Sequence, residues 1–401
     1  MGALFEAARE RDAACVMQTY ARKPIMFLSG DGMRLFDDDG REYLDFVSGI
    51  GAVNLGHAHP AVTEAVAQQA AKLVHVSNLF FVEHRAELAC DLNRLLGGGM
   101  RTFFANSGAE ANEGAIKIAR RWAGETKPGA FTVVTTHRSF HGRTLAALAA
   151  TGQASKQEAF APLPSGFVHV PLNDIDALSE ALDEGAAAFL VEVIQGEGGV
   201  WSATPEYLRA AEGLCRERDA LFMIDEVQTG FFRTGPAFAH QAFGITPDVV
   251  TLAKAMANGF PIGAVVAREE VAAAFRLGDH GSTFGGGPVV CAAGRATVAA
   301  LIAENAGENA LRSGEYLRAG LSRLGDASGA VTDVRGAGLM CGCTLAAPKA
   351  AEVASSMLQR GCVVNHIGAE FLRFLPPLVC GEAEIDTLLS ALSDVIEEVV
   401  A

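Results

Sequence analysis

The clearest pattern in the chain is a series of short apolar runs that alternate with stretches of helical spacing. Positions such as Ala111, Ala115 and Ile118 recur at the spacing of one helix face within 107–122, and a second helix is expected at 205–219. Mostly apolar segments of strand length lie at 101–105, 131–136, 186–193, 221–225, 248–253 and 262–267. Strands of this kind, alternating with helices, predict an α/β fold with a mostly parallel sheet covered on both faces.

The two ends of the chain have a different pattern. Residues 1–25 suit an amphipathic helix, and apolar stretches within 34–46 flank the Asp-Asp-Asp-Gly turn at 37–40, which predicts a hairpin. Beyond residue 290 long Ala- and Leu-rich helices appear, and 330–378 adds further strand-like pieces. Together these elements predict a smaller α+β domain to which both ends contribute.

The length of the chain agrees with more than one core. At 401 residues it exceeds an ordinary single domain, and half of its residues are apolar, as in globular proteins. We expect an N-terminal segment (1–50) that joins the small domain, a large domain (51–289) and a C-terminal small domain (290–401).

Composition excludes several classes of partner. The formal net charge is −15, which argues against nucleic acid or an anionic membrane surface as the main partner. No apolar run reaches the roughly 20 residues that span a bilayer, and the charged N-terminal stretch does not match an export signal, so we expect a cytoplasmic protein. The close pairs Cys341/Cys343 and His57/His59 lack a second pair at ligand spacing, so no metal site is expected.

Two strand ends carry charged residues that need an explanation. The apolar run 221–224 leads directly into Asp225 and Glu226. The strand could simply reach solvent there, but a buried carboxylate is costly unless it meets a cation. Lys254 ends the apolar run 251–253 in the same way; it could extend to solvent or form a Schiff base with an aldehyde.

A third feature is a strand-to-helix junction that suits an anion. The sequence FFANSGAEANE (103–113) enters a helix through small residues, and a helix N-terminus offers free N–H groups and a positive dipole end. Ser107 and Glu110 also have the spacing of a capping box, and the two interpretations are compatible. A phosphate cradle, a buried aspartate and a lysine, all at the carboxyl edge of one sheet, suggest pyridoxal 5′-phosphate.

The sequence resembles the class III aminotransferases, the acetylornithine and ornithine type of fold-type-I pyridoxal-phosphate enzymes, from LGHAHP (55–60) to LRFLPPL (372–378). The motifs that carry the resemblance are SGAEAN (107–112), FHGRT (140–144), QGEGG (195–199), IDEVQTG (224–230), TLAK (251–254) and HGSTFGG (280–286). The resemblance implies a seven-stranded, mostly parallel sheet flanked by helices, and the smaller α+β domain.

The resemblance also implies how the cofactor is held. Lys254 is expected to bind the cofactor covalently and then to move the proton between substrate and cofactor, and Asp225 to pair with the pyridine nitrogen. Thr283 is expected to reach the cofactor phosphate of a neighbouring subunit, which implies a homodimer. The remaining expected contacts are Gln228 at the ring hydroxyl, Val227 and Phe140 on the two ring faces, and Ser107, Gly108 and Ala109 at the phosphate.

The substrate residues follow from the same resemblance. Arg373 is expected to pair with Glu197 while the amino donor is bound, and to be released to grip the α-carboxylate of 2-oxoglutarate or glutamate. Arg143 is the second carboxylate anchor, and arginine suits both tasks because its planar fork binds a carboxylate through two bonds. Glu192 and Ser282 are further expected pocket residues.

The implied reaction moves the δ-amino group of N2-acetyl-L-ornithine to 2-oxoglutarate in a ping-pong sequence, as in arginine biosynthesis. Ile50 stands where ornithine aminotransferases carry a tyrosine for the free α-amino acid, which disfavours free ornithine. Trp201, Phe231 and Phe232 depart from the family pattern. Alternative donors therefore stay open: ornithine, succinylornithine, N-succinyl-diaminopimelate and 4-aminobutyrate. An aminomutase or racemase, and a non-catalytic binding protein of this fold, are more distant alternatives.

Overall fold

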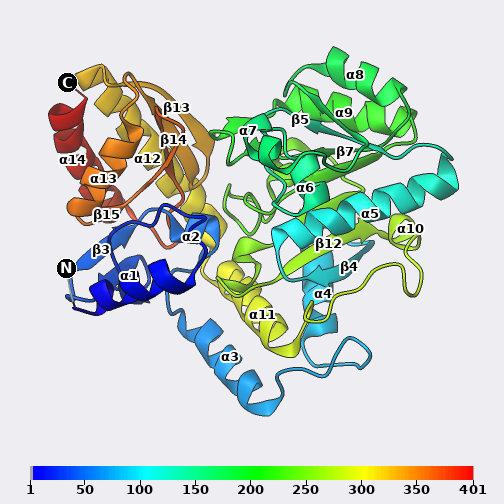
Figure 1. Cartoon of the computed structure of the whole chain (residues 1–401), viewed down its shortest axis with the longest axis horizontal. Helices are drawn as coiled ribbons and strands as arrows, with labels where there is room; N and C mark the ends of the chain where they lie inside the picture. Colours follow the sequence, from blue (N-terminus) through cyan, green and yellow to red (C-terminus); the bar gives the residue numbers. More distant parts are fainter. Residues whose placement is uncertain (1–2, 401) are drawn as a thin grey trace.

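The structure is a computed structural model that describes residues 3–400. Figure 1 shows two bodies side by side, one built on a large sheet and the other formed by the two ends of the chain. In the described part of the chain, no single helix is both long and apolar enough to cross a bilayer, although α11 (Pro288–Ala303) and α12 (Ala306–Ser328), bent by 65° at their junction, pass that test when taken together.

The central element is a seven-stranded sheet in the order β4-β12-β11-β10-β7-β5-β6. The strands from β11 to β6 are parallel, and β12 runs antiparallel to both β11 and β4. This arrangement confirms the predicted mostly parallel sheet. The strands are β4 (Met100–Ala105), β5 (Thr132–Thr136), β6 (Phe167–Val170), β7 (Ala186–Val191), β10 (Leu221–Asp225), β11 (Val249–Leu252) and β12 (Gly263–Arg268).

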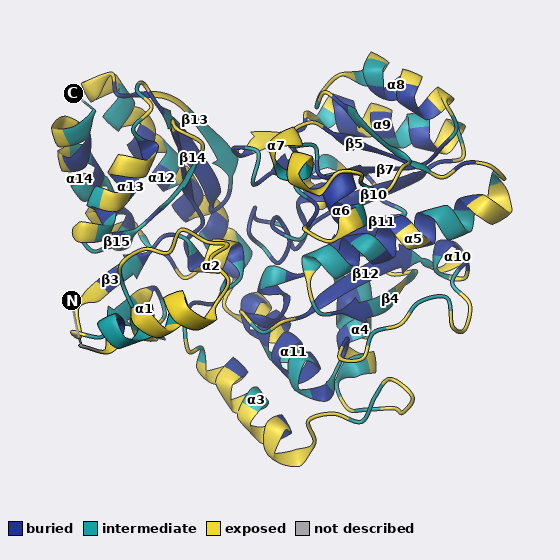
Figure 2. Cartoon of the chain, viewed as in Figure 1, coloured by how far each residue is buried: buried dark blue, intermediate teal, exposed yellow. Residues whose placement is uncertain are grey.

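Helices cover both faces of this sheet, because the buried strands are apolar on both sides. On β10, Phe222 and Ile224 pack in one cluster with α8 and α9, while Leu221 and Met223 pack in another with α5. The helices and 3₁₀ turns of this body are α3 (Pro60–Lys72), α4 (Arg85–Leu95), α5 (Gly108–Thr126), α6 (Leu145–Ala150), α7 (Ala154–Gln157), η1 (Glu158–Phe160), α8 (Ile175–Asp183), α9 (Pro205–Glu217), η2 (Ala239–Phe243), η3 (Lys254–Ala257), α10 (Glu269–Ala272) and α11 (Pro288–Ala303). Figure 2 shows the strands as the most buried layer.

Two further sheets lie outside the central one, and one of them joins the ends of the chain. In the sheet β1-β2-β3-β15, Leu44 of β3 pairs in parallel with Cys362 of β15. The other sheet has the order β13-β14-β17-β16. The elements are α1 (Ala3–Cys15), β1 (Phe27–Asp31), β2 (Arg34–Asp37), β3 (Glu42–Asp45), α2 (Ser48–Gly51), α12 (Ala306–Ser328), β13 (Val331–Ala337), β14 (Met340–Leu345), α13 (Ala350–Gln359), β15 (Cys362–Val363), β16 (Asn365–Ile367), β17 (Phe371–Phe374) and α14 (Glu382–Val399). A two-stranded ribbon, β8 (Ile194–Gln195) with β9 (Trp201–Ser202), completes the fold. The predicted domain limits at residues 50 and 289 stay a prediction.

The prediction of a helix over 1–25 is wrong in its extent, because α1 ends at Cys15; residues 1 and 2 lie outside the described part. Beyond Cys15 the apolar side chains find no core to pack against, and Met17 is 86 % exposed. Helices gain most of their stability from such packing, and Pro24 further disfavours helical backbone before it. By contrast, the predicted hairpin at 34–46 is confirmed, with β2 antiparallel to β3.

Candidate active site

A cavity of about 370 Å³ opens at the carboxyl ends of β10 and β11, next to the first turn of α5. A site at this edge is the common arrangement in open α/β sheets. The predicted site residues that line it are Ser107, Gly108, Ala109, Phe140, Arg143, Glu192, Glu197, Asp225, Val227, Gln228 and Lys254. Folding thus brings together eleven of the residues that the sequence singled out, from six separate motifs or strand ends.

Asp225, the last residue of β10, is 4 % exposed and is fixed in orientation by three donors. Its Oδ2 accepts a hydrogen bond from Nδ2 of Asn112 (2.8 Å) and lies 2.8 Å from Nδ1 of His141. Its Oδ1 accepts the backbone N–H of Val227 at 2.9 Å. The carboxylate is therefore held at the cavity wall before any ligand arrives.

Glu226, next along the chain, has a different role. It is fully buried and accepts hydrogen bonds from the hydroxyl of Thr229 and the backbone N–H groups of Ala239 and His240, at 2.5, 3.0 and 2.8 Å. These bonds tie the loop after β10 to η2. Of the two acids at the strand end, only the first, Asp225, lines the cavity.

Lys254 begins η3 directly after β11 and lines the cavity. Its backbone has a φ of 46°, in the left-handed region that a residue with a side chain seldom occupies. Burial lowers the pKa of the Lys254 amine, and the nearby Arg373 cation lowers it further, although carboxylates around it oppose the shift. An amine in this setting loses its proton more readily than a surface lysine.

The first turn of α5 forms the floor of the cavity. Ser107 is the N-cap, and its hydroxyl accepts the N–H of Glu110 at 3.2 Å, which confirms one half of the expected capping box. The Glu110 carboxylate accepts the N–H of Asn106 at 2.6 Å instead of that of Ser107. The next two residues, Gly108 and Ala109, contribute first-turn N–H groups, which lack intrahelical partners. A Cβ at Gly108 would lie 2.7 Å from Cγ1 of Val227, so only glycine lets that side chain approach the helix end.

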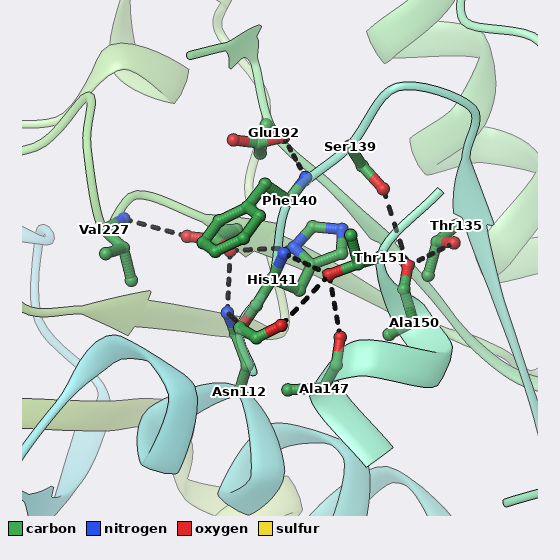
Figure 3. A network of polar contacts seen from close by, with 12 residues as sticks. Asn112, Thr135, Ser139, Phe140, His141, Ala147, Ala150, Thr151, Glu192 and Val227 are labelled. Atoms are coloured by element: carbon green, nitrogen blue, oxygen red, sulfur yellow. Dashed lines mark hydrogen bonds and ion pairs between the residues drawn. The ribbon is translucent and has the colours of Figure 1, made fainter. Parts of the chain in front are cut away.

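Glu192 is a buried acid that lines the cavity, 6 % exposed. Its Oε2 accepts the backbone N–H of Phe140 at 3.1 Å, and so fixes the loop that carries the Phe140 ring (Figure 3). Burial raises the pKa of Glu192 well above its usual range, and the neighbouring Asp225 carboxylate raises it further. A raised pKa favours the protonated form of this acid.

Arg373, on β17, does not line the cavity itself but approaches it from the other body of the molecule, behind Glu197 and Gln228, and is only 1 % exposed. Its Nη1 donates to Oε1 of Glu197 at 2.5 Å and to the carbonyl of Gly196 at 3.0 Å, and its Nε and Nη2 donate to Asn365. Burial alone would raise the pKa of Glu197, but the Arg373 cation outweighs this and holds the pKa below its usual range. The predicted Arg373–Glu197 pair is therefore present as a formed ion pair.

Gln228 also lines the cavity and contacts Arg373 of this pair. Its Oε1 accepts a hydrogen bond from Nη1 of Arg373 at 3.3 Å. A Cβ at Gly196 would lie 1.9 Å from the same Oε1, so the close approach of Gln228 requires glycine at that position.

Three predicted residues are peripheral. Arg143 lines the mouth of the cavity with its guanidinium carbon 5.7 Å from the centre of the Phe140 ring. Ser282 does not line the cavity; its hydroxyl accepts from Asn106 at 3.1 Å and from the backbone N–H of Gly285 at 3.0 Å. Thr283 is exposed and also lies outside the cavity of its own chain.

Sequence reasoning missed two residues that orient Asp225. Asn112 and His141 stand inside quoted motifs, SGAEAN and FHGRT, but neither was given a role. Both side chains lie in the network of polar contacts in Figure 3, and Nδ2 of Asn112 also donates to the carbonyl of His141 at 2.7 Å. No local pattern could reveal this contact, because the two residues come from different elements.

The residues present fit pyridoxal phosphate. The cavity has an anion-binding helix end, a fixed carboxylate for a ring nitrogen and an amine with a lowered pKa. Its wall also holds two buried polar atoms without a partner in the structure, Nε2 of His141 and Oδ1 of Asn112, of the kind that a polar ligand or ordered water satisfies. Among residues 3–400, no group of three or more His, Cys, Asp or Glu side chains is arranged to hold a metal ion.

Comparisons with known proteins give a consistent result. The Aminotransferase class-III family matches residues 16–396. The acetylornithine aminotransferase of Caldanaerobacter subterraneus subsp. tengcongensis is 48 % identical over 385 residues, which are 96 % of this chain and 98 % of that protein. A solved ornithine aminotransferase from Toxoplasma gondii, described with partial occupancy of pyridoxal phosphate at its active site, superposes with a TM-score of 0.95 at 33 % identity, over 99 % of this chain and 95 % of that one.

A second solved structure, acetylornithine aminotransferase from Elizabethkingia anophelis, gives a TM-score of 0.88 at 31 % identity and covers 98 % of this chain and 99 % of that one. The family match spans the cavity and both bodies of the fold. The chain belongs to the class-III family of aminotransferases, enzymes that use pyridoxal phosphate.

Proposed function

We propose that this enzyme transfers the δ-amino group of N2-acetyl-L-ornithine to 2-oxoglutarate, as a cytoplasmic homodimer that serves arginine biosynthesis. The observation that carries the proposal is the Arg373–Glu197 ion pair at the wall of the Lys254 cavity. A transaminase must accept two different carboxylate substrates in one pocket. An arginine that can exchange a protein carboxylate for a substrate carboxylate meets that need.

The residues that line the cavity define where the cofactor would bind. When bound, pyridoxal phosphate supplies an electron sink for the substrate carbon that loses its proton. The first turn of α5 would hold its phosphate, and Asp225 its ring nitrogen. Val227 and Phe140 would cover the two ring faces, and Gln228 would meet the ring hydroxyl.

Lys254 is the residue that would hold and move the proton. Its Nζ can accept a proton at neutral pH only if its pKa lies well below that of a surface lysine, and burial lowers it. The negative charges around it, from Glu197 and Asp225, act against this lowering of the pKa and favour return of the proton to the amine.

The two substrates would be distinguished by their carboxylates. Arg143 at the cavity mouth would hold the carboxylate of N2-acetyl-L-ornithine while Arg373 stays paired with Glu197. With 2-oxoglutarate, Arg373 would leave Glu197 and grip the α-carboxylate, and Arg143 would hold the distal one. Both arginines present the fork that binds carboxylates through two bonds.

The acylated donor is supported by the segment before Ala52, a residue that lines the cavity. Ile50 in this segment has a φ of 64° and offers no hydroxyl to a free α-ammonium group. An N-acyl group removes that charge and with it the need for a polar partner. The names of the relatives, acetylornithine aminotransferases, agree with this choice.

The homodimer is supported by an exposed apolar surface next to Thr283. Leu79, Phe80 and Phe81 are 86 %, 63 % and 107 % exposed, and Phe284 is 66 % exposed. Nδ2 of Asn78 donates to the carbonyls of Ser282 and Gly285 at 2.7 and 3.1 Å and so holds the two segments together. Clustered exposed aromatic residues of this kind mark interfaces, and a second copy would cover them.

The test is a single-turnover measurement. Purified protein loaded with pyridoxal phosphate is mixed with N2-acetyl-L-ornithine in the absence of keto acid, and the visible absorbance of the cofactor is followed. We expect conversion to the pyridoxamine form, and return to the starting spectrum when 2-oxoglutarate is added. Free ornithine, succinylornithine and 4-aminobutyrate are tested in parallel. If the cofactor is converted faster with one of these donors than with N2-acetyl-L-ornithine, that donor is the preferred substrate and the proposed one is wrong.

A further inference from the structure

Trp201, one of the departures from the family pattern, lies in an aromatic clamp around a single arginine. The guanidinium carbon of Arg335, on β13, is 3.9 Å from the centre of the Trp201 ring and 4.2 Å from the centre of the Phe371 ring. Trp201 belongs to β9 and Phe371 to β17. The arginine therefore joins the β8–β9 ribbon to the sheet formed by the C-terminal part of the chain, through contacts that favour arginine over lysine.

The clamp lies beside Arg373 in the same sheet. Arg335 pairs across the strands with Gly342, and Gly342 pairs with Arg373, so the two arginines lie in one cross-strand row. Directly opposed residues in antiparallel strands point to the same face. A Cβ at Gly342 would lie 2.5 Å from Cζ of Phe371, so the phenyl ring covers the glycine and fills the space between the arginines.

These two arginines hold the two ends of one turn. Nη1 of Arg373 donates to the carbonyl of Gly196 at 3.0 Å, and Nε of Arg335 donates to the carbonyl of Gly199 at 2.7 Å. Between these carbonyls lies Glu197, the carboxylate that pairs with Arg373. When Arg373 turns toward a substrate, its hydrogen bonds to Glu197 and Gly196 would break. The hydrogen bond from Arg335 to Gly199 does not involve Arg373 and would remain.

We propose that Arg335, clamped between Trp201 and Phe371, is a positioning residue that holds the Glu197 turn in register with Arg373 and thereby sets the preference between the amino donor and the α-carboxylate substrates. This inference rests on the proposed function. Without the clamp the turn loses its anchor at Gly199 and keeps only the bond at Gly196 and the ribbon bond from the N–H of Val200 to the carbonyl of Gln195. Glu197 then meets Arg373 less often. Arg373 is then free for an α-carboxylate more of the time, so glutamate and 2-oxoglutarate gain relative to N2-acetyl-L-ornithine.

The main experiment compares Arg335→Gln with the wild-type holoenzyme. We expect the ratio of kcat/KM for glutamate to kcat/KM for N2-acetyl-L-ornithine to rise about five- to tenfold, within the usual range of coupling between neighbouring residues. The change should lie in KM, since Arg335 touches neither cofactor nor substrate. Arg335→Lys keeps the charge but loses the planar stack, so it should give an intermediate shift.

A binding measurement gives a readout without turnover. Glutarate has both carboxylates of 2-oxoglutarate but no reacting group, and its dissociation constant for the holoenzyme can be measured by calorimetry. Arg335→Gln should bind glutarate about five times more tightly than wild type. In a Glu197→Ala background the same substitution should change nothing, because the carboxylate that the clamp positions is gone. Exposed Arg323 on α12 supplies the control Arg323→Gln, which should behave as wild type.

The outcomes separate this inference from the proposed function. If wild-type enzyme converts no N2-acetyl-L-ornithine and binds no glutarate, the proposed function fails. Suppose that wild type converts N2-acetyl-L-ornithine and binds glutarate. The positioning role is then refuted if Arg335→Gln leaves the kcat/KM ratio unchanged or lowers both reactions equally. It is also refuted if Arg335→Gln shifts the ratio as much in the Glu197→Ala background as in wild type. Should Arg335→Gln not fold, Trp201→Leu decides in its place. Trp201 is 40 % exposed, and its loss should shift the ratio in the same direction by a smaller factor.

Discussion

His141 and Asp225 form a buried pair at the end of β10, with Nδ1 of His141 2.8 Å from Oδ2 of Asp225. The backbone N–H of His141 donates to the hydroxyl of Thr151 at 2.9 Å, so the loop that carries the imidazole is itself fixed (Figure 3). Asn112 donates to the same carboxylate oxygen. The carboxylate thus enters any reaction already oriented, and this preorganisation is where its effect on a rate would arise.

Replacement of Asp225 by Asn should slow the half-reaction with the amino donor about a hundred- to a thousandfold. The amide keeps the shape of the side chain but cannot hold a proton on a ring nitrogen by charge. Stopped-flow absorbance of the loaded enzyme measures the rate. The adjacent acid supplies the control: Glu226→Gln should lower thermal stability but leave most of the rate in the folded enzyme. Near-normal rates in Asp225→Asn would contradict the assignment.

The Gly196→Ala variant tests the close packing behind the cavity. The new Cβ would lie 1.9 Å from Oε1 of Gln228, so Gln228 must leave Arg373. Overpacking of this kind costs about 1–3 kcal/mol of unfolding free energy, and activity should fall with it. Gly213→Ala on α9 is the matched control, since a Cβ there meets nothing within 4 Å. It should stabilise the protein by up to about 1 kcal/mol. Thermal denaturation and turnover measure both variants. Equal effects of the two substitutions would show that the close packing of Gly196 against Gln228 contributes to neither stability nor activity.

Much of the large sheet could be predicted because its strands carry their own signal. Residues 221–224 are apolar throughout, and residues 249–253 are apolar except for Thr251, as expected of strands buried on both faces. The strand β6 (Phe167–Val170) was missed, since a short run interrupted by His169 has no clear period. The helix over 1–25 was overextended because an amphipathic spacing does not reveal whether a core exists to receive it.

The site was predictable residue by residue but not as an arrangement. Motifs gave the identities of Lys254, Asp225 and Arg373, and the structure brings the first two into one cavity with the third directly behind. The clamp on Arg335 could not have been foreseen, because it depends on a side-chain bond to the backbone of a segment more than 130 residues away, from Arg335 to Gly199. Contacts of this kind have no trace in local spacing.

The buried acid Glu192 should make stability depend on pH. Burial and the neighbouring Asp225 raise the pKa of Glu192 in the folded state above its ordinary value of 4.5. At a pH between the ordinary pKa and the raised pKa, the folded state therefore binds more protons than the unfolded state. Stability contributed by Glu192 is thus present below pH 4.5 and is lost as pH rises toward the folded pKa, by up to about 1.4 kcal/mol per pH unit. Glu192→Gln removes this dependence and keeps the acceptor for Phe140.

Urea denaturation of the cofactor-free protein over pH 5–8 measures the effect. The difference in unfolding free energy between Glu192→Gln and wild type should grow in favour of the variant as pH rises. A difference that stays constant with pH would mean that Glu192 is ionised throughout this range. A difference that shrinks would reverse the sign of the argument.

The shared site can be tested by mixing two defective variants. Lys254→Ala should be inactive, since no other amine takes its place. Thr283→Ala should bind pyridoxal phosphate about tenfold more weakly, as expected when one hydrogen bond to a charged group is lost, while its dimer remains intact. In a mixed dimer, Lys254 of the Thr283→Ala subunit meets an intact Thr283 from its partner. Activity at limiting cofactor should therefore rise when the variants are unfolded together and refolded.

The exposed aromatic residues give the control for this experiment. Phe81→Ser removes apolar surface from the expected interface, so dimers of this variant should dissociate at higher protein concentrations than wild-type dimers. The affinity for the cofactor should fall as the dimer is lost. Sedimentation measures the first effect and titration with pyridoxal phosphate the second. If refolded mixtures show only the sum of the two separate activities, Thr283 serves no neighbouring site. If Phe81→Ser loses the dimer but keeps full cofactor affinity, each chain holds its cofactor alone, and the exposed position of Thr283 outside its own cavity has no catalytic meaning.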